Sequence, residues 1–201
     1  MASSVTYVGD GVSGVHVWGA QLEVGAFPTS YIPTTTTAVT RAGDIPNSTP
    51  SDIGFVLGPG TMFCEFAFAG GSSVVNPNTR AAMTIDDGLT SDRHYIYNIA
   101  GAVGGLTQNG GVTQAAPSVS GTIPVAQFVK AGYAFAENDF IFAVGGVLSS
   151  HDSSGLLPNA PITNVRVGVS GTGGSVLNGW IRSARYYPKR LTNAQLQALT
   201  A

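Results

Sequence analysis

The chain has 201 residues, of which 43% are hydrophobic and only 10% are charged, and its formal net charge at pH 7 is −2. This balance excludes a broad basic surface for nucleic acid, which needs clustered Lys and Arg, and a lone cysteine excludes an intramolecular disulfide. No apolar run reaches the roughly 18 residues of a membrane helix, so we expect a soluble chain. The 27 glycines are about twice the usual share of ~7%, which suits a β-protein with many turns.

The first 26 residues carry two short runs with a strand pattern, Ser4–Val8 and Val15–Val24, joined by a Gly-Asp-Gly turn signal at residues 9–11. Two strands cannot bury a core alone. We therefore expect residues 1–26 to dock on the main module, to pair with another chain, or to end an upstream sandwich domain. Because unpaired strand edges seek partners, this segment favours a homo-oligomer. Residues 27–51 are rich in Pro and Thr and predict an extended connector on the surface.

The main module is expected at residues 52–201, where short alternating apolar patterns follow one another. The Gly-rich stretch 101–111 predicts only a weak strand and turn, whereas Glu137-Asn138 predicts a tight hairpin turn. At least seven strands with turn signals roughly every 8–12 residues indicate an antiparallel β-sandwich rather than alternating βα units. The predicted strands are Thr61–Ala69, Arg80–Asp86, Arg93–Ile99, Val112–Ala116, Phe128–Ala136, Asp139–Val147, Thr163–Val169 and Gly179–Tyr187.

The last strand and the helix after it have explicit local signals. The apolar positions shift phase between Ile181 and Ala184, which predicts a β-bulge. Thr192 and the residue three positions on, Gln195, match a capping box, and Leu191 and Leu196 occupy the positions of a hydrophobic staple. A short helix is therefore predicted at the end of the module.

Three segments together resemble the concanavalin A-like (laminin G-like) jelly rolls. Residues Gly179–Leu199 resemble the signature that closes that sandwich, Phe128–Phe140 its central hairpin, and Phe142–Gly146 its turn, with Gly145 where the family has Asp or Asn. The resemblance implies an all-β fold: an antiparallel β-sandwich (concanavalin A-like jelly roll) with a short C-terminal helix.

A second resemblance lies further upstream. Residues Val15–Glu23, Pro28–Thr34 and Thr40–Ala42 are similar to a linker of bacteriophage tail and other virion structural proteins, where it leads into a concanavalin A-like sandwich. This implies a virion-associated tail fibre, tailspike or decoration protein, made in the host cytoplasm, with Met1 as an internal start. It further implies a homo-oligomer, with a trimer favoured, and other virion proteins and a host cell-surface glycan as partners. Nucleic acid and membrane are not expected partners.

Sugar sites combine an aromatic platform with planar polar groups, and the module offers both on strands and in a rim loop. Trp180 is interpreted as a core residue in preference to a platform. The densest basic group, at residues 182–190, is interpreted as the solvated edge of a strand and its turn rather than a phosphate site. The candidate carbohydrate-binding residues are Tyr95, Tyr97, His94, His151 and Asp152.

Calcium is the metal that the sequence supports best, and no other cofactor is expected. Asp86, Asp87 and Asp92 bracket one loop, and hard cations take oxygen ligands from such loops. The alternative stays open, because Asp-Asp-Gly is also good turn chemistry.

No catalytic residue is expected. Glycosidases of this architecture need two carboxylates about 5–5.5 Å or 6.5–9.5 Å apart, and neither Glu65 nor Glu137 has a second acid at a strand spacing that would give this. The expectation is a non-enzymatic module that is structural and binds host-surface carbohydrate. The alternatives are an accessory domain of a polysaccharide-degrading enzyme, or a depolymerase whose site forms between subunits.

Overall fold

The computed structural model describes residues 8–22, 30–39, 45–68, 79–99, 101–121, 123–124, 126–171 and 173–201. The chain divides into two units, Met1–Ala42 and Gly43–Ala201. No helix among these described residues is long and apolar enough to cross a membrane.

The first unit contains a turn at Asp10 and a local fold-back further along. Asp10 accepts hydrogen bonds from the backbone N–H of Val12 (2.9 Å) and of Ser13 (2.6 Å), which confirms the predicted turn. Trp18 packs edge-on against Tyr31 with ring centroids 5.6 Å apart.

The predicted strand Val15–Val24 is not formed over residues 15–22, which have no strand partner and whose apolar side chains are exposed. Residues 23 and 24 lie outside the described part, as does the predicted strand Ser4–Val8 apart from its last residue. Residues 30–39 run without helix or strand, as expected of a connector.

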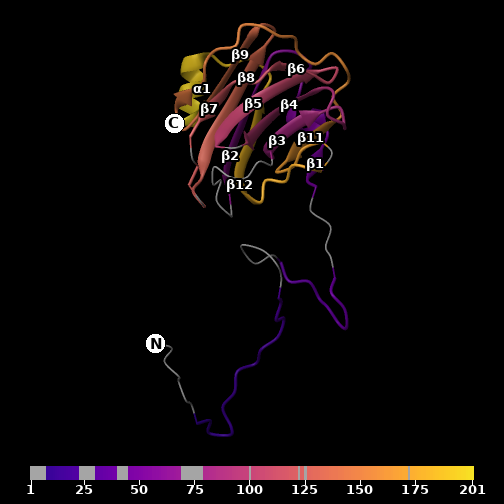
Figure 1. Cartoon of the computed structure of the whole chain (residues 1–201), viewed down its shortest axis with the longest axis vertical. Helices are drawn as coiled ribbons and strands as arrows, with labels where there is room; N and C mark the ends of the chain where they lie inside the picture. The colour runs from indigo at the N-terminus through magenta and orange to yellow at the C-terminus, as the bar shows by residue number, and fades with distance from the viewer. Residues whose placement is uncertain are drawn as a thin grey trace. The chain divides into compact units, whose positions relative to one another are not determined.

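The second unit is a sandwich of two antiparallel sheets (Figure 1). Among the described residues, sheet A has the order β1 (Asn47–Ser48), β11 (Asn164–Val167), β3 (Arg80–Asp86), β4 (Arg93–Ile99), β5 (Ala102–Asn109) and β6 (Val112–Ala115), with β7 (Ser118–Ser120) also paired to β5. Sheet B has the order β10 (Val147–Leu148), β9 (Asp139–Val144), β8 (Val129–Ala136), β2 (Gly60–Phe68) and β12 (Gly179–Tyr187). A 3-10 turn, η1 (Pro50–Ile53), precedes β2, and α1 (Asn193–Thr200) follows β12. The predicted fold class is confirmed.

The core lies between the inner faces of the two sheets. On β2 the alternating residues Met62, Cys64, Phe66 and Phe68 are all wholly buried. Burying each such large apolar side chain contributes roughly 1.5–3 kcal/mol. Burial also raises the pKa of the Cys64 thiol to about 12, which fits a small core residue.

Helix α1 covers part of the outer face of sheet B. Thr192 accepts a hydrogen bond from the backbone N–H of Gln195, whose side chain reaches back to the backbone of Thr192, so the predicted capping box is confirmed. Such a cap contributes about 1 kcal/mol. Leu196 is wholly buried against β8 and β9, and Gly132 leaves room for it, because a Cβ there would lie 2.7 Å from a Leu196 methyl.

Four features differ from the expectations or refine them. The bulge in β12 is confirmed between Ile181 and Ser183. The Gly-rich stretch forms a full strand, β5. Strand β1 and η1 fall within the stretch expected to be connector and belong to the second unit. Arg166 is only 7% exposed, and its strand neighbour Thr84 donates a hydrogen bond to the backbone oxygen of Val169 in the loop after β11.

Candidate functional site

The two candidate tyrosines lie on the outer face of sheet A, on β4. Tyr95 is only 6% exposed. The Arg93 guanidinium lies 4.5 Å from its ring centroid, and the Tyr97 ring packs against it at 4.9 Å. Burial raises the pKa of both tyrosines. Arg93, Tyr95 and Tyr97 thus pack against one another, and of the two tyrosines only the partly exposed Tyr97 offers surface to a ligand.

His94 points the other way, into the core, because alternate residues of a strand face opposite sides. It is 1% exposed, its ring stacks on Phe135 at 3.8 Å, and its Nδ1 shares a hydrogen bond with the Thr107 hydroxyl (2.8 Å). Thr107 shares a second one with the Tyr133 hydroxyl (2.6 Å). Burial lowers the pKa of His94 from 6.5 to about 3. A side chain in this position cannot contact an external sugar.

The candidate calcium ligands are used by the protein itself. Both carboxylate oxygens of Asp86 are held by Arg166. Asp87 accepts the backbone N–H of Leu89 (2.8 Å), and one oxygen of Asp92 accepts that of Gly110 (3.3 Å) while the other has no partner. Within the described ranges, no group of three or more His, Cys, Asp or Glu side chains could hold a metal ion. The geometry fits the turn interpretation of this loop.

His151 and Asp152, in contrast, are brought together with a distant segment. They line a hollow of about 560 Å³ where the loop after β10 faces the link between β6 and β7. This volume is within the usual range for ligand pockets, roughly 300–1,000 Å³. We call it the rim hollow; its lining residues are Ala116, Pro117, Ser118, Ser150, His151, Asp152 and Ser153.

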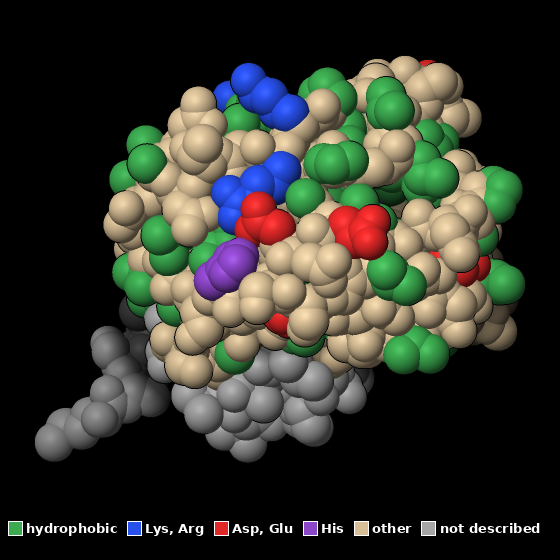
Figure 2. Space-filling model, turned by 90° about the horizontal axis from the view of Figure 1, so that it is seen from above, with side chains coloured by type: hydrophobic (Ala, Val, Ile, Leu, Met, Phe, Trp, Pro, Cys, Tyr) green, Lys and Arg blue, Asp and Glu red, His purple; other side chains and the backbone are tan. Residues whose placement is uncertain are grey.

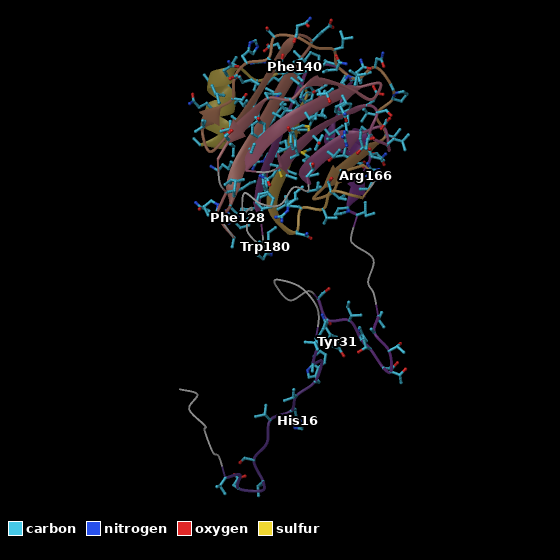
Figure 3. The ribbon with its side chains drawn as sticks, in the orientation of Figure 1. His16, Tyr31, Phe128, Phe140, Arg166 and Trp180 are labelled. Carbon is cyan, nitrogen blue, oxygen red and sulfur yellow. The ribbon has the colours of Figure 1, made fainter. Side chains whose placement is uncertain are left out.

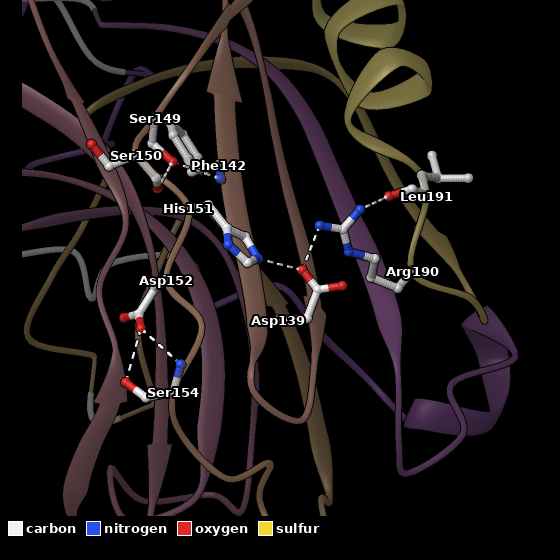
Figure 4. A network of polar contacts seen from close by, with 9 residues as sticks. All are labelled: Asp139, Phe142, Ser149, Ser150, His151, Asp152, Ser154, Arg190 and Leu191. Carbon is white, nitrogen blue, oxygen red and sulfur yellow. Dashed lines mark hydrogen bonds and ion pairs between the residues drawn. The ribbon is translucent and has the colours of Figure 1, made fainter.

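Backbone and side-chain bonds hold the loop in place. The N–H and C=O of Asp152 pair with those of Phe140, at 3.0 and 2.8 Å, so the loop continues the edge of sheet B. The Asp152 carboxylate accepts from the backbone N–H and the hydroxyl of Ser154. Figure 4 shows the bonds of Asp152 with Ser154 together with those of Ser149.

An ion network lies beside the hollow. One oxygen of Asp139 is 2.8 Å from Nε2 of His151 and accepts a hydrogen bond from Nη2 of Arg190 at 2.6 Å (Figure 4). Although burial alone would raise it, the hydrogen bonds from His151 and Arg190 hold the pKa of Asp139 below its ordinary value. Figure 2 shows a histidine, an acidic and a basic side chain adjoining on the upper face of the molecule.

The rim hollow is therefore lined by three serines, one histidine and one aspartate, most of them on a loop fixed to a sheet edge. Such groups form hydrogen bonds with ligand hydroxyls. Asp152 is the one acidic residue of the lining. A glycosidase pair would need a second carboxylate facing the same space.

No family model and no curated protein matches the sequence. Solved structures do match. The CBM40 of the Ruminococcus gnavus IT-sialidase, bound to α2,3-sialyllactose, is 16% identical, with 73% of this chain and 84% of that chain covered and a TM-score of 0.54. The NanB sialidase of Streptococcus pneumoniae is 12% identical (78% and 27% covered, TM-score 0.59), so this chain matches about a quarter of it. A SAP-like pentraxin from Limulus polyphemus is 12% identical (72% and 70%, TM-score 0.51). At these identities the likeness is one of fold.

Proposed function

We propose that the second unit is a non-catalytic carbohydrate-binding module and that the rim hollow receives the glycan. The observation that carries this proposal is a hollow of ligand size that is lined by three serines, His151 and Asp152. The fold likeness to a module bound to sialyllactose supports it.

Removing the Asp152 carboxylate tests this proposal. A hydrogen bond to a charged group is worth about 1.5–3 kcal/mol, so Asp152→Ala should weaken glycan binding by about 10–100-fold. Asp152→Asn keeps an acceptor for Ser154 and should bind more tightly than the alanine variant. Binding is measured on a panel of immobilised oligosaccharides of defined structure.

The exposed Glu137, outside the hollow, provides a control of equal charge, and Glu137→Ala should bind as the unaltered protein does. Unfolding midpoints check that each variant is folded. The rim hollow is not the site if the unaltered protein binds no glycan of the panel. The same holds if Asp152→Ala binds every glycan as tightly as the unaltered protein does.

We further propose that this chain belongs to a phage tail fibre, tailspike or other virion protein. That protein would display several copies of the module to a host-surface glycan. Repeated copies would raise the avidity of weak single sites. Support comes from the tail-protein resemblance of residues 15–42 and from the exposed apolar side chains of the first unit. An accessory domain of a glycan-degrading enzyme fits the fold comparisons equally well. A depolymerase with an intersubunit site would instead need carboxylates from two chains.

Oligomerisation is expected to depend on the first unit. The side chains of Val15 and Val17 are 89% and 82% exposed, and association would remove them from water. We expect light scattering to show a mass of three copies for the full chain. The variant with both valines replaced by serine should have the mass of a single copy. Val147→Ser, at an exposed position of the sandwich, is the control. A full chain with the mass of one copy would contradict the trimer.

A further inference from the structure

The part of sheet B that α1 leaves uncovered carries an exposed tryptophan. In the register of β12 with β2, Trp180 pairs with Ala67, one residue from the inward-facing Phe66, so Trp180 is on the outer face. It is 50% exposed, which differs from the core position expected for it. Phe128 immediately precedes β8, whose Val129 pairs with Phe66. Figure 3 shows Trp180 and Phe128 at the same end of the sandwich.

Two arginines of β12 extend this surface along the strand. The Arg182 guanidinium stacks 3.9 Å from the Phe128 ring centroid, and its Nη1 donates to Glu65 at 2.7 Å. Its side chain is nevertheless 59% exposed. Arg185 lies 5.7 Å from the ring of Phe63. Both guanidinium groups are therefore supported by an aromatic ring and remain open to solvent.

The charge of this surface is positive although the chain as a whole is acidic. Lys130 pairs with Glu65 across β2 and β8, and its Nζ donates to the backbone oxygen of Ala201 at 2.5 Å. Three cations, Arg182, Arg185 and Lys130, thus accompany the carboxylate of Glu65, and Lys130 is partnered by the oxygen of Ala201. Among the described residues, Arg185 has no carboxylate partner; its Nε donates to the hydroxyl of Ser183 (3.1 Å).

We propose that Trp180, Arg182 and Arg185 form a second binding surface, for an oligosaccharide with a carboxylated sugar. The exposed indole suits the apolar face of a sugar ring. A guanidinium binds a carboxylate with two parallel hydrogen bonds, and stacking on an aromatic ring fixes its orientation beforehand. Because of the bulge, Trp180 and Arg185 pair with Ala67 and Phe63, which are four positions apart on β2. At ~3.3 Å per residue this spans about 13 Å, which favours an oligosaccharide over a single sugar.

This surface is distinct from the rim hollow and goes beyond the function proposed there. The hollow has Asp152 as its acidic group and no Lys or Arg in its lining, so a carboxylated sugar is better matched by the face of β12. The two sites can therefore be tested by separate variants.

The test compares 3′-sialyllactose with lactose by titration calorimetry on the full chain at low salt. The unaltered protein should bind the sialylated probe at least tenfold more tightly, and added salt should reduce the difference. Trp180→Ala and Arg185→Ala should each weaken its binding by at least fivefold. Lys189→Ala removes the same charge from an exposed position just beyond β12 and should weaken it less than twofold.

Equal affinity for lactose and for 3′-sialyllactose would overturn the proposal. Equal losses of affinity in Lys189→Ala and Arg185→Ala would also overturn it, because they would show that only the net charge matters. Equal binding of a single-stranded DNA oligonucleotide would also overturn it. Asp152→Ala separates this surface from the rim hollow. Sialyllactose binding that survives this change but not Arg185→Ala supports the surface, whatever happens at the hollow. If sialyllactose binding is lost only in Asp152→Ala, the proposal for the β12 surface is wrong and the rim hollow is the binding site.

Discussion

Replacement of Arg166 with methionine is expected to lower the free energy of unfolding by about 3–5 kcal/mol, because it leaves a buried carboxylate without its cation. Nη1 of Arg166 contacts both oxygens of Asp86, and the two side chains are 9% and 0% exposed. The remaining bond to Asp86, from the backbone N–H of Gly88 at 2.7 Å, cannot offset a full negative charge.

Urea denaturation of single and double variants measures this effect. Adding Asp86→Asn to Arg166→Met removes the charge, keeps an acceptor for Gly88, and should recover most of the loss. Arg182→Ala breaks an exposed ion pair with Glu65 and should cost less than about 1 kcal/mol. A loss below 1 kcal/mol in Arg166→Met, or a double variant no more stable than the single one, would contradict a stabilising role of the pair.

The sequence was informative wherever the cause of a structure is local. Alternation identified the strand that forms β2, and Thr192 with Gln195 identified the start of α1. Strand β5 was underestimated because the reason for its glycines is distant in sequence. A Cβ on Gly105 would lie 2.3 Å from the Tyr133 ring, and one on Gly104 would lie 2.9 Å from the Pro117 carbonyl. These glycines make room for neighbours, whereas strand propensity alone counts them as weak strand formers.

The candidate site was predictable only in part, for the same reason. The polar loop containing His151 and Asp152 could be recognised from its composition. Ser118, more than thirty residues upstream, carries no signal, because sheet pairing alone brings it to the hollow. His94 and Tyr95 are neighbours in sequence, yet one faces the core and the other the outer surface. The side of a strand that is buried depends on a register that a short pattern does not specify.

Acidification is expected to destabilise the sandwich through His94 in a defined pH range. Burial lowers its pKa from 6.5 to about 3, so between these values the unfolded chain binds a proton that the folded chain does not. The contribution of neutral His94 to the free energy of unfolding is then fully present above about pH 6.5 and is lost as the pH falls toward 3. The loss is about 1.4 kcal/mol per pH unit.

The comparison with His94→Phe isolates this contribution from the carboxylates and the other histidines, whose titration is common to both proteins. Phenylalanine can keep the stacking on Phe135, and Thr107 keeps its bond to Tyr133. At pH 7 the unaltered protein should be the more stable, since it retains the His94–Thr107 bond. By pH 5 urea denaturation should show this advantage reduced by about 2 kcal/mol. If the difference between the two proteins is the same at both pH values, His94 takes up its proton equally well in the folded state. The chain His94–Thr107–Tyr133 would then not be the sealed, neutral network that its burial implies.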